Sequence, residues 1–153
     1  MKTVLSILIV LWSGSFANAQ KLNESQVPAS VISAFHKMYP AEKDNGWEME
    51  DGNYEAEMNN SAGESSVIFT ATGALIQTEK EISVKELPAA IANYVSKNYA
   101  GAEIKEAAQI TDVKGVKTFE AEVKDYDLIF DAKGNFVRED RDSNEVKDSE
   151  DKN

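Results

Sequence analysis

The sequence contains no cysteine and only one histidine, and these absences remove several classes of function. Without cysteine the chain has no thiol nucleophile, no thiolate metal ligand and no disulfide, so a hydrophobic core must stabilise the fold alone. His36 lacks the second histidine of an H-x-x-x-H zinc motif, and no serine lies in a G-x-S-x-G motif. We therefore expect no catalytic residue, no metal site and no cofactor.

Positive charge is also scarce. Lysine and arginine number 16 against 27 acidic residues, which gives a net charge of −11. A surface this acidic repels nucleic acids and anionic lipids, so we expect no nucleic-acid partner. A protein with a basic or neutral surface is the expected partner.

The one long apolar run lies at the N-terminus and predicts a signal peptide. Lys2 precedes an apolar stretch at residues 4–12 that only Ser6 interrupts, and Ala17 and Ala19 form an A-x-A cleavage site. The run is shorter than the roughly 20 residues that a membrane-spanning helix needs. We predict cleavage between Ala19 and Gln20, a periplasmic or secreted protein, and no membrane span after removal of the signal.

Most of the remaining chain consists of two similar sequence repeats. Leu-Pro-Ala-Ala-Ile at 87–91 corresponds to Val-Pro-Ala-Ser-Val at 27–31, and Phe-Glu-Ala-Glu at 119–122 to Tyr-Glu-Ala-Glu at 54–57. A third block, 128–136, corresponds to 67–75 in the same order. We predict a signal peptide at 1–19, a polar lead-in at 20–26, repeats at 27–80 and 87–142 joined by a linker at 81–86, and a disordered acidic tail at 143–153.

Each repeat begins with the apolar spacing of a helix and continues with the apolar–polar alternation of β-strands. Val27, Val31 and Phe35 lie on one helical face after Pro28, and the period then changes from about four to two. The turns at 70–73 and 131–134 both place glycine fourth, which is typical of a three-residue hairpin loop. The predicted fold class is α+β, with two tandem helix-plus-four-strand repeats whose helices pack on one face of an antiparallel sheet. The repeats would join edge to edge or through the linker.

The hairpin turns also predict which side chains share a face. Phe69 should lie opposite Leu75 and Phe130 opposite Phe136, facing the helices, because opposed residues in an antiparallel pair share a face. The residues one position farther from each turn should then pair on the opposite, open face of the sheet. Together with four glutamates they form a candidate partner-binding face. Its predicted members are Ile68, Ile76, Ile129, Val137, Glu55, Glu57, Glu120 and Glu122. Isoleucine and valine are also common on exposed strands that bind nothing.

Three other chemical interpretations fit the sequence less well. The pairs Glu55/Glu57 and Glu120/Glu122 have the carboxylates of a glycosidase, but nothing on an open sheet would raise one pKa above the other. The aspartates near Asp131 lack the spacing of a calcium loop. Trp47 could stack on a ligand, but its alternation places it in the core.

Several motifs together resemble one family. They are the V/L-P-A-x-V/I start, the Tyr-Pro or Tyr-Ala-Gly helix end, Trp-Glu at 47–48, Y/F-E-A-E and F-x-x-x-G. The chain in this respect resembles the PepSY-like proteins described as similar to β-lactamase-inhibitor protein, which are small exported bacterial proteins frequent in Bacteroidetes. The resemblance covers residues 27–140 and implies tandem copies of a helix on an antiparallel sheet. The name implies inhibition, but no inhibitory residue can be carried over, and the inhibitor's disulfides are missing here.

These observations favour a non-catalytic exported binding module, with inhibition of an exported enzyme as one form of it. The alternative is a periplasmic protein that binds a small molecule or cation on the acidic sheet face. A structural or envelope-stress role is a third hypothesis. The target, the oligomeric state, the physiological role and the continuity of the sheet between the repeats do not follow from the residues.

Overall fold

The computed structural model describes residues 20–50, 52–60 and 63–141. The predicted signal peptide and the whole of the predicted tail therefore lie outside the described residues. The elements, in chain order, are β1 (Gln20–Leu22), a 3-10 turn η1 (Glu24–Gln26), α1 (Ala29–Met38), β2 (Gly46–Glu50), β3 (Asn53–Asn60), β4 (Gly63–Phe69), β5 (Leu75–Glu81), a 3-10 turn η2 (Val84–Glu86), α2 (Ala89–Asn98), β6 (Ala107–Asp112), β7 (Lys117–Val123), β8 (Tyr126–Asp131) and β9 (Phe136–Arg141).

The described strands form a single antiparallel sheet whose spatial order is the order of the chain, β1 to β9. The predicted fold class, two helix-plus-four-strand repeats, is therefore wrong: the molecule is mainly one nine-stranded sheet with two short helices. The predicted polar lead-in supplies the additional strand, since Gln20, Lys21 and Leu22 pair with β2. Polar residues suit this place because an edge strand of a sheet stays exposed.

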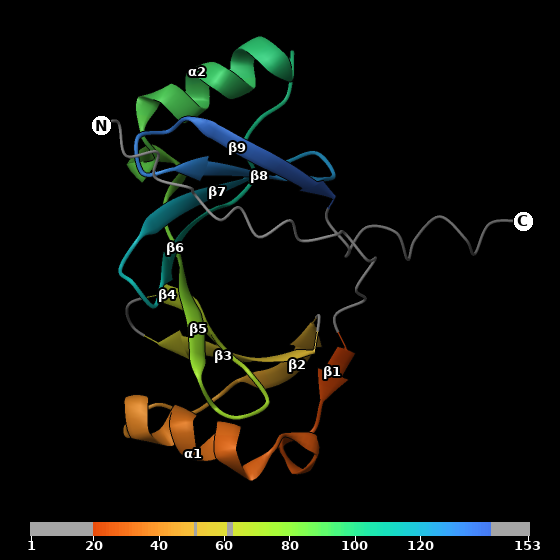
Figure 1. Cartoon of the computed structure of the whole chain (residues 1–153). Coiled ribbons are helices and arrows are strands. Elements are labelled where there is room, and N and C mark those ends of the chain that lie inside the picture. Colours follow the sequence, from red (N-terminus) through yellow and green to blue (C-terminus); the bar gives the residue numbers. More distant parts are fainter. Residues whose placement is uncertain (1–19, 51, 61–62, 142–153) are drawn as a thin grey trace, which may run out of the picture.

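The sheet is strongly curved, with α1 and α2 lying outside the curve at its two ends (Figure 1). β5 and β6 form the middle of the curve and pair from Gln77 with Asp112 to Glu81 with Ala108. The two halves of the chain are thus joined by ordinary strand pairing. The side chains that face inward on the two halves share one concave surface.

Proline and the chain's apolar spacing determine where α1 begins and which face it buries. Pro28 is the N-cap, and Val31 and Phe35, four positions apart, are fully buried. The helix ends before Pro40, because the residue preceding a proline is disfavoured in the α region. α2 repeats the pattern with Pro88, Ile91 and Val95.

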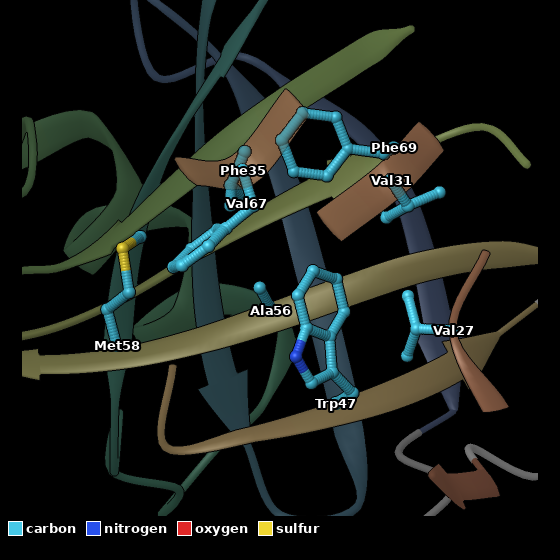
Figure 2. Packing of buried hydrophobic residues seen from close by; sticks show 8 residues of the cluster. All are labelled: Val27, Val31, Phe35, Trp47, Ala56, Met58, Val67 and Phe69. Atoms are coloured by element: carbon cyan, nitrogen blue, oxygen red, sulfur yellow. The ribbon is translucent and has the colours of Figure 1, made fainter. Parts of the chain in front are cut away.

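Two separate hydrophobic clusters lie between the helices and the sheet. The first, shown in Figure 2, consists of Val27, Val31, Phe35, Trp47, Ala56, Met58, Val67 and Phe69. Trp47 is 2% exposed and its ring centroid lies 5.5 Å from that of Phe35, so the prediction that it belongs to the core is confirmed. The second cluster consists of Leu87, Ile91, Val95, Ala107, Ala121, Val123, Leu128 and Phe130.

The glycine-closed turns have the predicted geometry. Gly73 and Gly134 both have φ of +80°, a left-handed conformation that glycine adopts without penalty. The first pairs beyond the turns, Phe69 with Leu75 and Phe130 with Phe136, are also confirmed.

The two α-helices in the described part of the chain are ten residues long. A helix of that length spans about 15 Å, half of the roughly 30 Å hydrocarbon core of a bilayer. Neither could cross a membrane.

Candidate functional site: an acidic groove

The predicted apolar pairs on the open face do not form. A β-bulge after each glycine turn shifts the register, so that Ile68 lies opposite Gln77 and Ile129 opposite Arg138. Ile76 and Val137, the predicted partners, are the extra residues of the two bulges. The pairing prediction is wrong because it assumed an unbroken ladder, whereas a bulge places two residues of one strand against one of the other.

The four apolar residues consequently differ in exposure. Ile129 is 4% exposed, although its side of β8 was predicted to be open, and Val137 is 54% exposed on the edge strand β9. Ile68 and Ile76 are half-buried. Ile68 on β4 and Ile129 on β8 lie opposite a polar and a charged residue, Gln77 and Arg138, so the structure does not form the two apolar cross-strand pairs that were predicted.

The predicted glutamates do come together. Glu55 and Glu57 of β3 and Glu120 and Glu122 of β7 line one open groove of about 310 Å³. Strand alternation directs all four side chains away from the helices, and curvature of the sheet turns the two halves toward each other. The register supports this: Glu55 lies opposite Glu48 and Ile68, and Glu120 lies opposite Ala108 and Ile129.

Four further glutamates of the groove were missed from the sequence. They are Glu64, Glu79, Glu81 and Glu106, and they bring the lining to eight glutamates. Glu79 and Glu81 belong to β5, where Glu79 was assigned to the end of the first repeat and Glu81 to the start of the linker. Their spacing of two residues, the same as in the predicted pairs, was a signal that could have identified them. Among the described residues that line the groove there is no lysine or arginine.

Burial and mutual repulsion make the groove electrostatically unfavourable for negative charge. Burial raises the pKa of Glu120 to about 8, and the charges of Glu79 and Asp127 add to the rise while Arg138 opposes it. Ala108 and Ile129, which flank Glu120 on the neighbouring strands, are both nearly inaccessible to water. An apolar surrounding favours the neutral form of a carboxyl group, so this glutamate holds a proton near neutral pH.

The N-terminal half shows a weaker version of the same effect. Burial raises the pKa of Glu55, Glu48 and Glu57 add to the rise, and the Ser66 hydroxyl opposes it. The sequence-based argument that nothing would raise one carboxyl pKa above another is therefore wrong. It treated the sheet as flat and solvated, whereas the concave face buries its carboxylates.

Basic side chains lie at the rim of the groove and at the sheet edges. Lys105 Nζ lies 2.9 Å from Glu122 Oε1 and also donates to the Lys124 carbonyl at 2.8 Å. Arg138 pairs with Asp140 at 2.7 Å on the edge strand β9. Lys105 and Arg138 thus lie beside the groove and are not among the residues that line it.

The groove does not have the geometry of a metal centre. Across residues 20–50, 52–60 and 63–141, no three His, Asp or Glu side chains are grouped closely enough to hold a metal ion. Asp131 acts in its turn instead, where its Oδ1 accepts hydrogen bonds from the Lys133 and Asn135 amides at 2.8 and 2.9 Å. These bonds hold the pKa of Asp131 below its ordinary value, the side-chain amide of Asn135 contributing most.

Comparison with known proteins identifies a family. The sequence model of the beta-lactamase-inhibitor-like, PepSY-like family matches the chain twice, over residues 12–77 and 54–138. A search of curated proteins returns no match.

Solved structures from Bacteroides share the fold. A periplasmic protein from Bacteroides eggerthii superposes with a TM-score of 0.66 at 20% identity, covering 79% of this chain and 93% of the other. A DUF2874 family protein from Bacteroides ovatus gives 0.64 at 24% identity, covering 78% and 91%. A BLIP-like protein from Bacteroides fragilis gives 0.58 at 22% identity, covering 82% and 92%. The description of the first neighbour agrees with the periplasmic location predicted from the sequence.

Proposed function

Because the chain belongs to the beta-lactamase-inhibitor-like, PepSY-like family, we propose that it is a non-catalytic periplasmic module that binds another protein through its acidic groove. The partner contributes a segment that carries lysine or arginine. In the form that the family description suggests, the partner is an exported enzyme and the module inhibits it.

The observation that carries this proposal is the gathering of eight glutamates from both halves of the chain around one groove. Burial is the main cause of the raised pKa values of Glu55 and Glu120, and neighbouring carboxylates add to the rise, so like charges in the groove destabilise one another. A cationic side chain that enters the groove removes this repulsion and gains charge-assisted hydrogen bonds. In this proposal the groove is the place where a basic ligand binds.

The shape supports a protein segment as the ligand. The groove is open to solvent and is lined by residues of the neighbouring strands β3, β4, β5, β6 and β7, so a loop or hairpin of another protein can reach it. The negative field of the whole protein, with a net charge of −11, would also speed the encounter with a basic partner.

A defined probe tests the groove before a natural partner is identified. Binding of a hexalysine peptide is measured by calorimetry at low salt with the wild type and with the double variant Glu55→Gln/Glu120→Gln. Each lost hydrogen bond to a charged group costs about 1.5–3 kcal/mol, so we expect the double variant to bind at least about tenfold more weakly. Added salt should weaken binding by the wild type.

The matched control makes two Glu→Gln changes outside the groove, and it removes at least as much charge as the groove variant because Glu120 is largely protonated near neutral pH. Glu24 and Glu103 are exposed and do not line the groove, so Glu24→Gln/Glu103→Gln should bind as the wild type does. The same variants are then used to capture partners from a periplasmic extract. Equal losses in both double variants would mean that net charge, and not the groove, attracts basic ligands, and the proposal would be abandoned.

A further inference from the structure

The turn between β6 and β7, residues 112–117, is chemically unlike the surface around it. Val113 and Val116 are 59% and 55% exposed, the two highest values among the exposed large hydrophobic residues of the described chain. Lys114 and Lys117 alternate with them and are also exposed. On an acidic protein, this hairpin presents a compact surface that is both apolar and basic.

Hydrogen bonds hold the hairpin in one shape. Asp112 Oδ1 accepts from the Lys114 and Val116 amides, each at 2.8 Å. The Gly115 amide donates to the Asp112 carbonyl at 2.9 Å, and the Asp112 amide donates to the Val116 carbonyl at 3.0 Å. A pre-organised hairpin loses little conformational entropy when it binds, which favours a role in recognition.

The fold does not need these valines. The turn between β8 and β9 has the same Asp-x-Lys-Gly sequence but carries Ala132 where the first has Val113. That second turn packs on α2, since a Cβ at Gly134 would lie 2.9 Å from the Ala90 Cβ, whereas a Cβ at Gly115 would meet nothing within 4 Å. The 112–117 hairpin is therefore not packed against a helix at Gly115, and both of its valines are more than half exposed.

The acidic groove has the complementary chemistry. Its lining includes carboxylates for the lysines, and Ala108, which lies opposite Glu120, is an apolar residue of the same face for the valines. Ala108 stands near the start of β6 and the hairpin follows the end of that strand, about 13 Å from Ala108 to Asp112 at the usual rise of a strand. A rigid hairpin at the far end of the same strand does not fold back into its own groove.

We propose that the 112–117 hairpin of one copy docks in the acidic groove of a second copy, in a head-to-tail contact. The inference rests on the proposed function to the extent that both use the same groove. A head-to-tail contact leaves one groove and one hairpin unoccupied, so it extends into a short chain of copies unless its rotation closes a ring. Each occupied groove is closed to a basic partner, and self-association thus competes with partner binding.

Ionic strength defines the conditions for the test. Two copies that each carry a net charge of −11 repel one another at long range, but the Debye length is about 10 Å at 0.1 M salt, which screens that repulsion. Contacts between the lysines and the groove act over shorter distances. We expect association in about 0.1 M salt and its loss in about 1 M salt, where the Debye length is about 3 Å.

Sedimentation equilibrium over a wide concentration range measures the association of the exported chain. The average mass of the wild type should rise above that of a monomer as concentration increases. Lys114→Glu/Lys117→Glu should remain a monomer. The control Lys85→Glu/Lys133→Glu makes the same charge change at exposed sites outside the hairpin and should associate no less than the wild type, while circular dichroism verifies that both variants fold.

A mixing experiment tests the head-to-tail geometry. The groove variant Glu55→Gln/Glu120→Gln keeps an intact hairpin, and the hairpin variant keeps an intact groove. Each alone should be monomeric, and an equimolar mixture should form dimers and nothing larger. A wild type that stays monomeric, a hairpin variant that associates like the wild type, or a mixture without dimers overturns the proposal.

The hexalysine measurement separates this inference from the proposed function. If hexalysine binding depends on Glu55 and Glu120 while the wild type is monomeric at every concentration, only the self-association is wrong. If hexalysine binding is indifferent to both glutamates, the groove is not a basic-ligand site and both proposals fail.

Discussion

Replacing Gly73 by alanine should destabilise the protein far more than the same change at Gly115. Both glycines close the same kind of hairpin turn, with φ of +80° and +77°. A Cβ at Gly73, however, would lie 2.5 Å from the Ser30 carbonyl oxygen and 3.0 Å from its carbonyl carbon, in the backbone of α1. At Gly115 the added atom would meet nothing within 4 Å.

The comparison separates two energies that are usually measured together. An L-residue in the left-handed region costs about 1–2 kcal/mol, and this is the whole expected cost at Gly115. Forcing an extra atom into a packed contact costs a further 1–3 kcal/mol or so, which gives about 2–5 kcal/mol for Gly73→Ala. The collision is with helix backbone, and the Ser30 hydroxyl also donates to the Ala71 carbonyl at 2.9 Å, so α1 and the turn cannot separate without further loss.

Urea unfolding of the two variants provides the measurement. Gly73→Ala should lower the midpoint markedly and Gly115→Ala only slightly, with unchanged slopes, since a midpoint change at constant slope reports stability. Gly134→Ala should fall between them, because its closest obstacle is the Ala90 side chain and not backbone. Equal losses at Gly73 and Gly115 would show that the turn does not press on α1, and the described packing of helix on hairpin would be incorrect.

Four further predictions follow from the core, the groove and the N-terminus. Burial raises the pKa of Glu120 from 4.5 to about 8, so the contribution of this residue to stability is fully present below the lower value and is lost as the pH rises through about 8. The urea midpoint should therefore decrease as the pH is raised from about 5 to about 9. Glu120→Gln should flatten this dependence, and a steeper dependence in the variant would contradict the argument. Phe130→Ala should cost about 3–5 kcal/mol and Ile129→Ala about 2–5 kcal/mol, since both are buried; a loss below about 1 kcal/mol at Ile129 would mean that its side of the sheet is solvated. The exported protein should begin at Gln20, and a mass that retains Met1 would refute the cleavage prediction. Chelator or reductant should leave the melting temperature unchanged, and a drop of more than about 4 °C with the chelator, on the order of 1 kcal/mol, would indicate a bound metal.

Local features could be predicted because neighbouring residues determine them. The helical face of Val27, Val31 and Phe35 depends only on a spacing of about four. The conformation of Gly73 depends on the four residues of its turn. The confirmed pairing of Phe69 with Leu75 follows directly from that turn.

The prediction of strand pairing is wrong one residue farther from each turn. Ile68 was expected opposite Ile76 and lies opposite Gln77. A bulge changes the register of strand pairing, but it leaves the alternation of apolar and polar residues almost unchanged, so the sequence pattern does not reveal it. The short strand β1 was missed for a related reason: Gln20, Lys21 and Leu22 have no pattern of their own and are held in the sheet by pairing with β2.

The sequence by itself determined that Glu55, Glu57, Glu120 and Glu122 point away from the helices, because alternation along a strand is a property of a few consecutive residues. Only the tertiary structure decided that these side chains share a groove with Glu79 and Glu81 of β5. The curvature that joins them accumulates over many strands and includes the bulges, so it is a property of the whole sheet. For the same reason only the folded molecule reveals that the groove buries charge and that the 112–117 hairpin stands clear of it at the far end of β6.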